Sequence, residues 1–260
     1  MDEELKRQLK FLRFKYLFEN WDHILKQAQK DNPSYFLFLK NIISGEYAHR
    51  RDSLKISRIK RANIKEVFIM ETYPFEKQPQ LKKKMILNLY DSLEFMQKRQ
   101  ELIFIGPTGC GKTGLATSFL THAIDHDYSC YFIDFKDLID QLYRSVADHT
   151  DGRVIKRFAA YDCLLIDELG YVSITKEQAG LFFDLMRKRQ KSRTTLITTQ
   201  LGFAEWNNFL QNTHLTAALI DRLTVHCTMF NLNKCTSLRP KNITQASTDK
   251  EIKSLPEKTK

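Results

Sequence analysis

Apolar residues recur at helical spacing in the first part of the chain, with few strand signals. From Leu5 to about Ile69, apolar side chains repeat every three or four residues. A new helix is predicted after Asn32-Pro33-Ser34, with Ser34 or Asn32 as its N-cap and its end near Gly45. The pattern therefore predicts a helical N-terminal region.

A short segment without periodicity follows this region. Residues 72–79 read Thr-Tyr-Pro-Phe-Glu-Lys-Gln-Pro, and the two prolines indicate an ordered linker. We therefore place a domain boundary near residue 72, with a helical, basic domain over 1–71 and a second domain over 72–239. The remaining residues, 240–260, are polar and Lys-rich, and we expect them to form a flexible tail.

Strand and helix patterns alternate through the second domain. Strands are predicted over 102–105, 130–133, 163–166, 194–198 and 225–231, and helices over 81–97, 113–125, 136–147, 176–189 and 217–223. Such alternation is typical of a mostly parallel sheet with crossover helices. The sequence thus predicts an α/β fold.

One glycine-rich segment lies between a predicted strand and a predicted helix. Residues 106–113 read Gly-Pro-Thr-Gly-Cys-Gly-Lys-Thr, which matches the phosphate-binding loop of P-loop NTPases, the Walker A motif. Its glycines let the backbone N–H groups face a phosphate anion, Lys112 is expected to reach the β and γ phosphates, and the Thr113 hydroxyl to bind Mg²⁺. The predicted nucleotide-binding residues are Gly106, Pro107, Thr108, Gly109, Cys110, Gly111, Lys112, Thr113 and Gly114.

Two acidic residues end a later apolar strand. Cys163-Leu-Leu-Ile is followed by Asp167 and Glu168, as in a Walker B motif. We expect Asp167 to hold Mg²⁺ and Glu168 to orient or deprotonate the attacking water. Apolar runs that end in acids are often only structural, but the preceding Walker A motif favours the catalytic interpretation.

Three further residues are candidates for contacts with the γ-phosphate. In an additional-strand ATPase, the strand at 194–198 would lie between the P-loop strand and the Walker B strand. Gln200, or otherwise Thr199, can then reach the phosphate or its water, unless both merely form a turn. Arg222 near a helix end suits an arginine finger that acts on a neighbouring subunit, and an intrachain ion pair is the alternative. Arg239 is a similar candidate.

The chain is basic, and its charge is clustered. Its 260 residues carry a formal charge of +10, which suits a nucleic-acid partner. The DNA-binding candidates are Arg50, Arg51, Lys55, Arg58, Lys60, Arg61 and Lys65, followed by a second cluster at Arg187, Lys188, Arg189, Lys191 and Arg193. A solvated helix face is the alternative for residues 50–65.

Several other classes of protein are disfavoured. The start of the chain is acidic and no apolar run approaches the ~20 residues of a membrane span, so we expect a cytoplasmic protein without a membrane partner. Five scattered cysteines predict reduced, mostly buried thiols. His122 and His126 lie one helical turn apart without a zinc motif, so a structural role is expected.

Taken together, the motifs resemble the IstB-like family of AAA+ ATPases, which is related to the DnaC helicase loader. The resemblance rests on Walker A, on Leu-Leu-Ile-Asp-Glu-Leu-Gly-Tyr at 164–171, and on Phe203 with Trp206 after the 194–198 strand. Asp-Arg-Leu at 221–223 and Ser-Leu-Arg at 237–239 extend it. Gln200 stands where the family usually has Asn, and Glu168 where it more often has Asp.

The resemblance implies an AAA+ P-loop NTPase with a parallel-sheet core and a small helical N-terminal domain. It also implies ATP and Mg²⁺ as cofactors, a homo-oligomer on duplex DNA, and recruitment of a transposase, with hydrolysis driving release. The alternatives are a DnaC-like loader of a replicative helicase, a nucleotide-gated DNA clamp with little hydrolysis, and a small-molecule kinase.

Overall fold

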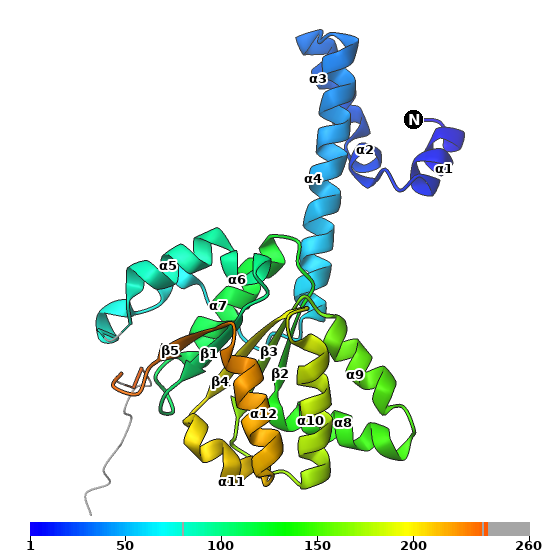
Figure 1. Cartoon of the computed structure of the whole chain (residues 1–260). Coiled ribbons are helices and arrows are strands. Elements are labelled where there is room, and N and C mark those ends of the chain that lie inside the picture. Colours follow the sequence, from blue (N-terminus) through cyan, green and yellow to red (C-terminus); the bar gives the residue numbers. More distant parts are fainter. Residues whose placement is uncertain (80, 236, 239–260) are drawn as a thin grey trace, which may run out of the picture.

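The computed structural model describes residues 1–79, 81–235 and 237–238 (Figure 1). All five predicted strands are present, each in nearly the predicted place. The strands are β1 (Glu101–Ile105), β2 (Cys130–Asp134), β3 (Cys163–Leu169), β4 (Thr194–Thr199) and β5 (Cys227–Asn231). The helices that follow the first three are α7 (Lys112–Asp125), α8 (Phe135–Ala147) with α9 (Asp151–Ala160), and α10 (Lys176–Arg189). The chain then forms η3 (Phe203–Glu205), α11 (Trp206–Leu210) and α12 (Thr213–Thr224).

The strands form one parallel sheet in the order β2-β3-β4-β1-β5. The strand β4 therefore lies between the P-loop strand β1 and the Walker B strand β3, as predicted. Because parallel strands all end at the same edge, the segments that follow β1, β2, β3 and β4 meet there.

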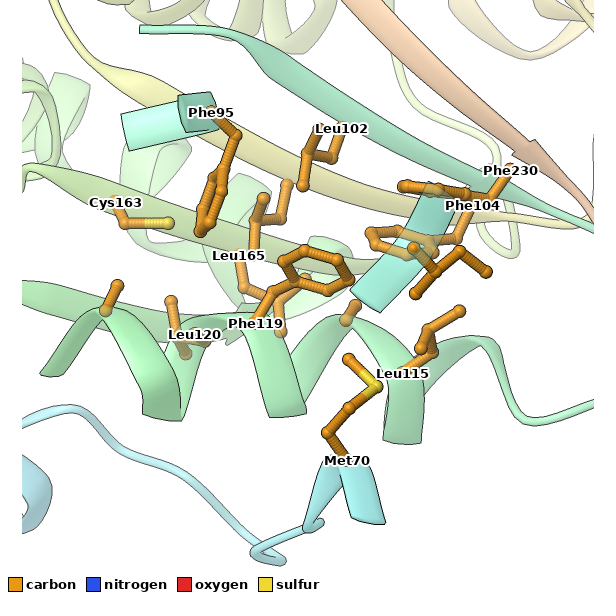
Figure 2. Close-up of a cluster of buried hydrophobic side chains, with 14 of the residues drawn as sticks. Met70, Phe95, Leu102, Phe104, Leu115, Phe119, Leu120, Cys163, Leu165 and Phe230 are labelled. Atoms are coloured by element: carbon orange, nitrogen blue, oxygen red, sulfur yellow. The ribbon is translucent and has the colours of Figure 1, made fainter. Parts of the chain in front are cut away.

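Alternate side chains of the strands build two cores on opposite faces of the sheet. One face packs against α7, where Phe119 contacts the rings of Phe95 and Phe104 at centroid distances of 5.3 and 6.1 Å (Figure 2). The other face packs against α8, α9, α10, α11 and α12. Full burial on both faces explains why β1 is a nearly continuous apolar run and why β4 consists mostly of β-branched residues.

The N-terminal region is helical, as predicted, but its longest helix is longer than expected. The elements are α1 (Glu3–Phe11), α2 (Lys15–Glu19), α3 (Trp21–Asp31) and α4 (Tyr35–Arg61). The expected helix end near Gly45 is wrong, because α4 continues through this residue. The Tyr16 ring of α2 lies so close that a Cβ on Gly45 would stand 2.2 Å from it, so the glycine serves a close helix contact instead of a helix end.

The first half of α4 keeps much of its apolar surface exposed. Tyr35 and Phe36 are 91% and 77% exposed, and Ile43 and Tyr47 are 67% and 66% exposed. Among the described residues of α1 to α4, only Leu9 is buried. The face that we expected to be apolar is thus present but only partly covered.

Two further differences concern helix boundaries. The single helix expected over 81–97 is split into α5 (Lys83–Ser92) and α6 (Glu94–Gln97), because Leu93 adopts a left-handed conformation with φ of 51°. The helix α9 was not predicted, although Ile155 and Phe158 lie about one turn apart on it and are both buried in the core.

Residues after α4 pack against the sheet domain instead of forming a spacer. They include η1 (Met70–Thr72) and η2 (Phe75–Lys77), and Met70 is 2% exposed within the core under α7. The domain boundary near 72 remains a prediction. Among the described residues, no helix is both long and apolar enough to cross a membrane.

Candidate nucleotide-binding site

The Walker A segment forms a tight loop between β1 and α7. Gly109 and Gly111 have φ of 82° and 90°, a conformation that L side chains rarely adopt. Gly111 is the N-cap of α7, so the first N–H groups of this helix point toward the loop. The loop therefore presents the anion-binding geometry that the motif predicts.

Lys112 and Thr113 leave the loop on the first turn of α7. The Lys112 ammonium group donates to the carbonyls of Gly106 and Pro107 at 2.8 and 2.9 Å, so it lies across the loop. The Thr113 hydroxyl donates to both carboxylate oxygens of Asp167, at 2.9 and 3.2 Å. The two residues predicted to bind Mg²⁺ thus meet, although 54 positions separate them in the sequence.

A bulge in β3 brings both Walker B acids to the same side. Between Ile166 and Leu169 the strand takes three steps while β4 takes two, from Ile197 to Thr199. Glu168 sits in this bulge with φ of 59° and is the exposed residue of an otherwise buried strand. Without the bulge, Asp167 and Glu168 would point to opposite faces of the sheet.

The end of β4 contributes Thr198 to the site. The Thr198 hydroxyl donates to Asp167 and accepts a hydrogen bond from the Glu168 backbone N–H at 3.0 Å. Thr199 instead points away, since its hydroxyl donates to the Leu169 carbonyl at 2.8 Å. Gln200 is exposed beyond the strand and does not line the cavity, so the structure does not bring it into the site.

Sequence reasoning missed Thr198 because it chose the residues just after the apolar core of the strand. The register of β3 and β4 pairs Ile166 with Ile197 and so places Asp167 opposite Thr198, and this register has no sequence signal. Strand alternation from Leu196 could nevertheless have favoured Thr198 over Thr199.

Both acids have pKa values above the ordinary range of carboxyl groups. Burial raises the pKa of Asp167, and the hydrogen bonds from Thr198 and Thr113 partly oppose this rise. Burial also raises the pKa of Glu168, and the nearby carboxylates of Asp167 and Asp134 raise it further. The buried carboxylate and the threonine hydroxyl beside it fit Mg²⁺, because the cation would compensate the buried negative charge. The nearby lysine fits the phosphate chain.

These residues line one cavity of about 780 Å³, a volume within the usual range for small-molecule sites. Its far wall comes from the segment after α4 and includes Phe68, Ile69, Thr72, Tyr73 and Pro74. Gln78 Nε2 donates to the Cys110 carbonyl at 3.1 Å, which ties this segment to the P-loop. The sequence predicts only a linker over residues 72–79, although the aromatic pair Tyr73 and Phe75 was a visible signal.

Tyr171 is a second residue that the sequence did not single out for the site. It lies just beyond the bulge, and its hydroxyl is 2.9 Å from the Thr108 hydroxyl of the P-loop. Tyr171 also lines the cavity. The Leu-Gly-Tyr segment after Walker B therefore contacts Walker A directly.

Arg222 lies far from its own P-loop. Its guanidinium group stacks on Phe183, 4.4 Å from the ring centroid. It lines a separate cavity with Glu101, the first residue of β1, whereas the P-loop follows the last residue of that strand. Its own nucleotide is thus out of reach, and action on a neighbouring subunit stays a prediction. Arg239 and the tail 240–260 lie outside the described residues.

Four of the seven predicted DNA-binding residues form ion pairs with the sheet domain. Arg51 and Arg58 pair with Asp127, Lys55 pairs with Asp125 at 2.8 Å, and Lys65 pairs with Asp134. Within the described chain, the other three, Arg50, Lys60 and Arg61, form no ion pair, and all three are exposed. The sequence could not show that the acids at the end of α7 face this helix.

The second basic cluster contains one residue that cannot contact DNA. Arg189 is fully buried and donates to the carbonyls of Phe158 and Tyr161 at 2.8 and 2.9 Å, so its assignment to a DNA surface is wrong.

Four of the five cysteines are buried and none forms a disulfide, as predicted. His122 stacks on Tyr90 at 3.9 Å, in keeping with a structural role.

The family model described as "IstB-like ATP binding protein" matches residues 7–246. The IS232 insertion-sequence protein of Bacillus thuringiensis subsp. berliner, named for ATP binding, is 30% identical over 88% of this chain and 92% of its own length. The corresponding IS21 protein of Pseudomonas aeruginosa is 29% identical over 96% of this chain and 98% of its own length.

Solved structures show the same fold at lower identity. The DnaC helicase loader is 21% identical with a TM-score of 0.52, over 60% of this chain and 90% of that protein. The replication initiator DnaA bound to AMPPCP and single-stranded DNA is 14% identical with a TM-score of 0.53, over 65% of this chain and 51% of that protein. The predicted AAA+ P-loop fold is thus confirmed.

Proposed function

The chain belongs to the family of IstB-like ATP-binding proteins, and from this premise we propose that it is a Mg²⁺-dependent ATPase that assists transposition. In this proposal, subunits assemble on duplex DNA with ATP bound and recruit or regulate a transposase. Hydrolysis of ATP to ADP and phosphate then releases or remodels the assembly.

The contact between Thr113 and Asp167 carries the ATPase part of the proposal. It joins Walker A to Walker B at 2.9 Å, beside a phosphate-binding loop. Glu168 extends from the bulge into the same cavity, where its carboxylate can accept a proton from water, and its raised pKa favours that role. Mg²⁺ bound here would neutralise phosphate charge.

Surface features support the partner part of the proposal. The exposed aromatic and aliphatic side chains on the first half of α4 form the kind of apolar surface that protein partners cover. Arg50, Lys60 and Arg61 supply exposed positive charge on the second half of the same helix. Arg222, at the opposite end of the sheet from the P-loop, suits a contact with the nucleotide of a neighbouring subunit.

The proposal is tested by ATP turnover with and without linear duplex DNA. The variants are Lys112→Ala, which removes the phosphate ligand, Glu168→Gln, which removes the base, and Arg222→Ala. We expect duplex DNA to stimulate the wild type, and each variant to lower turnover by at least tenfold. Arg222→Ala should still bind ATP.

Mixing two inactive variants tests for action between subunits. Lys112→Ala retains Arg222, and Arg222→Ala retains the P-loop, so a mixed oligomer should regain turnover that neither variant shows alone. Failure of every mixture to regain activity would contradict the finger in trans. Stimulation by single strands or by a helicase, but not by duplex DNA, would favour a helicase loader, and turnover unchanged in Glu168→Gln would favour a nucleotide-gated clamp.

A further inference from the structure

One of the predicted DNA-binding residues lies at the ATP site. Lys65 forms its ion pair with Asp134, the last residue of β2. Asp134 stands beside Asp167 in the register of β2 and β3. Lys65, Asp134, Asp167 and Glu168 all line the nucleotide cavity. The end of the basic stretch is therefore close to the hydrolytic residues.

Backbone contacts set the position of Lys65 independently of its charge. The Ala62 carbonyl accepts a hydrogen bond from the Phe132 N–H at 2.7 Å, and Asn63 Nδ2 donates to the Phe132 carbonyl at 3.0 Å. Because β2 is an edge strand, these bonds satisfy the outward-facing N–H and carbonyl of Phe132. Lys65 then extends past the Phe132 ring, 5.9 Å from its centroid, to reach Asp134.

The charge of Lys65 balances a cluster of acids. Three carboxylates, those of Asp134, Asp167 and Glu168, lie at the ends of two adjacent strands. Hydrogen bonding to Asp134 raises the pKa of Lys65, and the charge of Asp167 contributes to this rise. Among the described residues that line the cavity, the other cation is Lys112, which lies across the P-loop.

We propose that Lys65 is a positioning residue of the ATP site, which holds the Asp134 carboxylate away from the space that Asp167 and Glu168 share with Mg²⁺ and water. The inference rests on the proposed ATPase function. Without Lys65, an unpaired Asp134 adds a negative charge beside Asp167. A divalent cation is then bound more tightly, but Asp134 and Asp167 compete for it. ATP turnover therefore becomes slower.

The structure offers a matched set of variants of the full-length chain. Lys65→Met removes the charge and Lys65→Arg keeps it. Asp134→Asn removes the acid that Lys65 holds, alone or together with Lys65→Met. Lys156→Met is the control, because Lys156 is an exposed residue of α9 that forms no ion pair in the described chain. It makes the same change in net charge.

Three quantities are measured: the Mg²⁺ concentration for half-maximal binding of a fluorescent ATP analogue, kcat with KM for ATP, and Tm. Lys65→Met should lower the half-maximal Mg²⁺ concentration about three- to tenfold, because a nearby charge is uncovered. It should lower kcat about tenfold with KM changed less than threefold. Tm should stay near the wild type, since the Lys65 side chain is 61% exposed and such pairs add little stability.

The remaining variants separate positioning from structural damage. Lys65→Arg should retain wild-type kcat within about threefold, and Asp134→Asn should restore the Mg²⁺ dependence in the Lys65→Met background, because the two side chains act as a unit. The proposal is overturned if Lys65→Met matches Lys156→Met, or if it weakens Mg²⁺ binding and lowers Tm together. If the wild type binds Mg²⁺ and nucleotide without hydrolysis, the ATPase function fails, while the Mg²⁺ titration still decides the role of Lys65.

Discussion

Thr198 bridges the two Walker B acids, and its substitution by valine tests whether this bridge shapes the site. Valine has nearly the shape of threonine but lacks the hydroxyl. Thr198 is 1% exposed, so water cannot replace the hydrogen bonds to Asp167 and to the Glu168 N–H. Loss of a charge-assisted bond costs about 1.5–3 kcal/mol, and a buried unpaired N–H costs about 1–3 kcal/mol. Valine carries a methyl group in place of the hydroxyl, and burial of this group stabilises the fold by about 1 kcal/mol.

We therefore expect Thr198→Val to lower the free energy of unfolding by about 1.5–5 kcal/mol near neutral pH. The loss should depend on pH. Burial raises the folded-state pKa of Asp167 above its ordinary value, so ionised Asp167 costs stability as pH rises through that pKa. The Thr198 hydroxyl opposes the rise, so its removal should make the deficit larger at pH 7.5 than at pH 5.

Urea unfolding followed by circular dichroism at the two pH values measures this effect. Thr198→Ser keeps the hydroxyl and should restore most of the loss, whereas Gln200→Ala, at an exposed position outside the cavity, should stay within about 0.5 kcal/mol of the wild type. ATP turnover should fall about tenfold or more in Thr198→Val and less than threefold in Gln200→Ala. A deficit no larger than that of Gln200→Ala, or one that does not grow with pH, would refute the bridging role.

Three other perturbations test separate parts of the structure. Burial raises the pKa of Glu101 to about 7, so its ionisation lowers stability as pH rises through that value. Glu101→Gln should therefore raise the free energy of unfolding by about 1–3 kcal/mol at pH 8 and little at pH 4. Denaturant midpoints at the two pH values measure this difference. Phe119→Ala should cost about 3–5 kcal/mol of unfolding free energy in urea, because Phe119 is fully buried among aromatic rings. Asp127→Asn releases Arg51 and Arg58 and should strengthen duplex binding at low salt, with a steeper salt dependence in fluorescence anisotropy; equal slopes would argue against DNA contact at these arginines.

The sequence was sufficient for the parts of the site that are contiguous in the chain. The glycines and Lys112 of Walker A form one local loop, and the acids of Walker B end one apolar strand, so spacing alone could identify them. The strand order followed from the likeness to AAA+ proteins. Their meeting at Thr113 and Asp167 follows because parallel strands end at a common edge.

The remaining parts depend on contacts between distant segments, which a single sequence does not reveal. Lys65 was grouped with basic residues of its own helix region, yet the edge of β2 draws it to Asp134. The register of β3 and β4, which pairs Ile166 with Ile197, puts Thr198 and not Gln200 beside Asp167. Gly45 lies within α4, where the Tyr16 ring occupies the space that a side chain would need. In each case a tertiary contact overrode a local preference.

The helix α4 is long and unbroken, so a small rotation at its base would move its far end over a long distance. Its 27 residues span about 40 Å at 1.5 Å per residue, and Figure 1 shows it extending from the sheet domain with α3 beside its far end. Its near end is held to α7 by ion pairs and continues to Lys65 at the ATP site. A tilt of only about 10° at that base would move the far tip by about 7 Å, by the same helix length. Any change of tilt at the base is therefore amplified along the helix to the exposed apolar side chains of its first half.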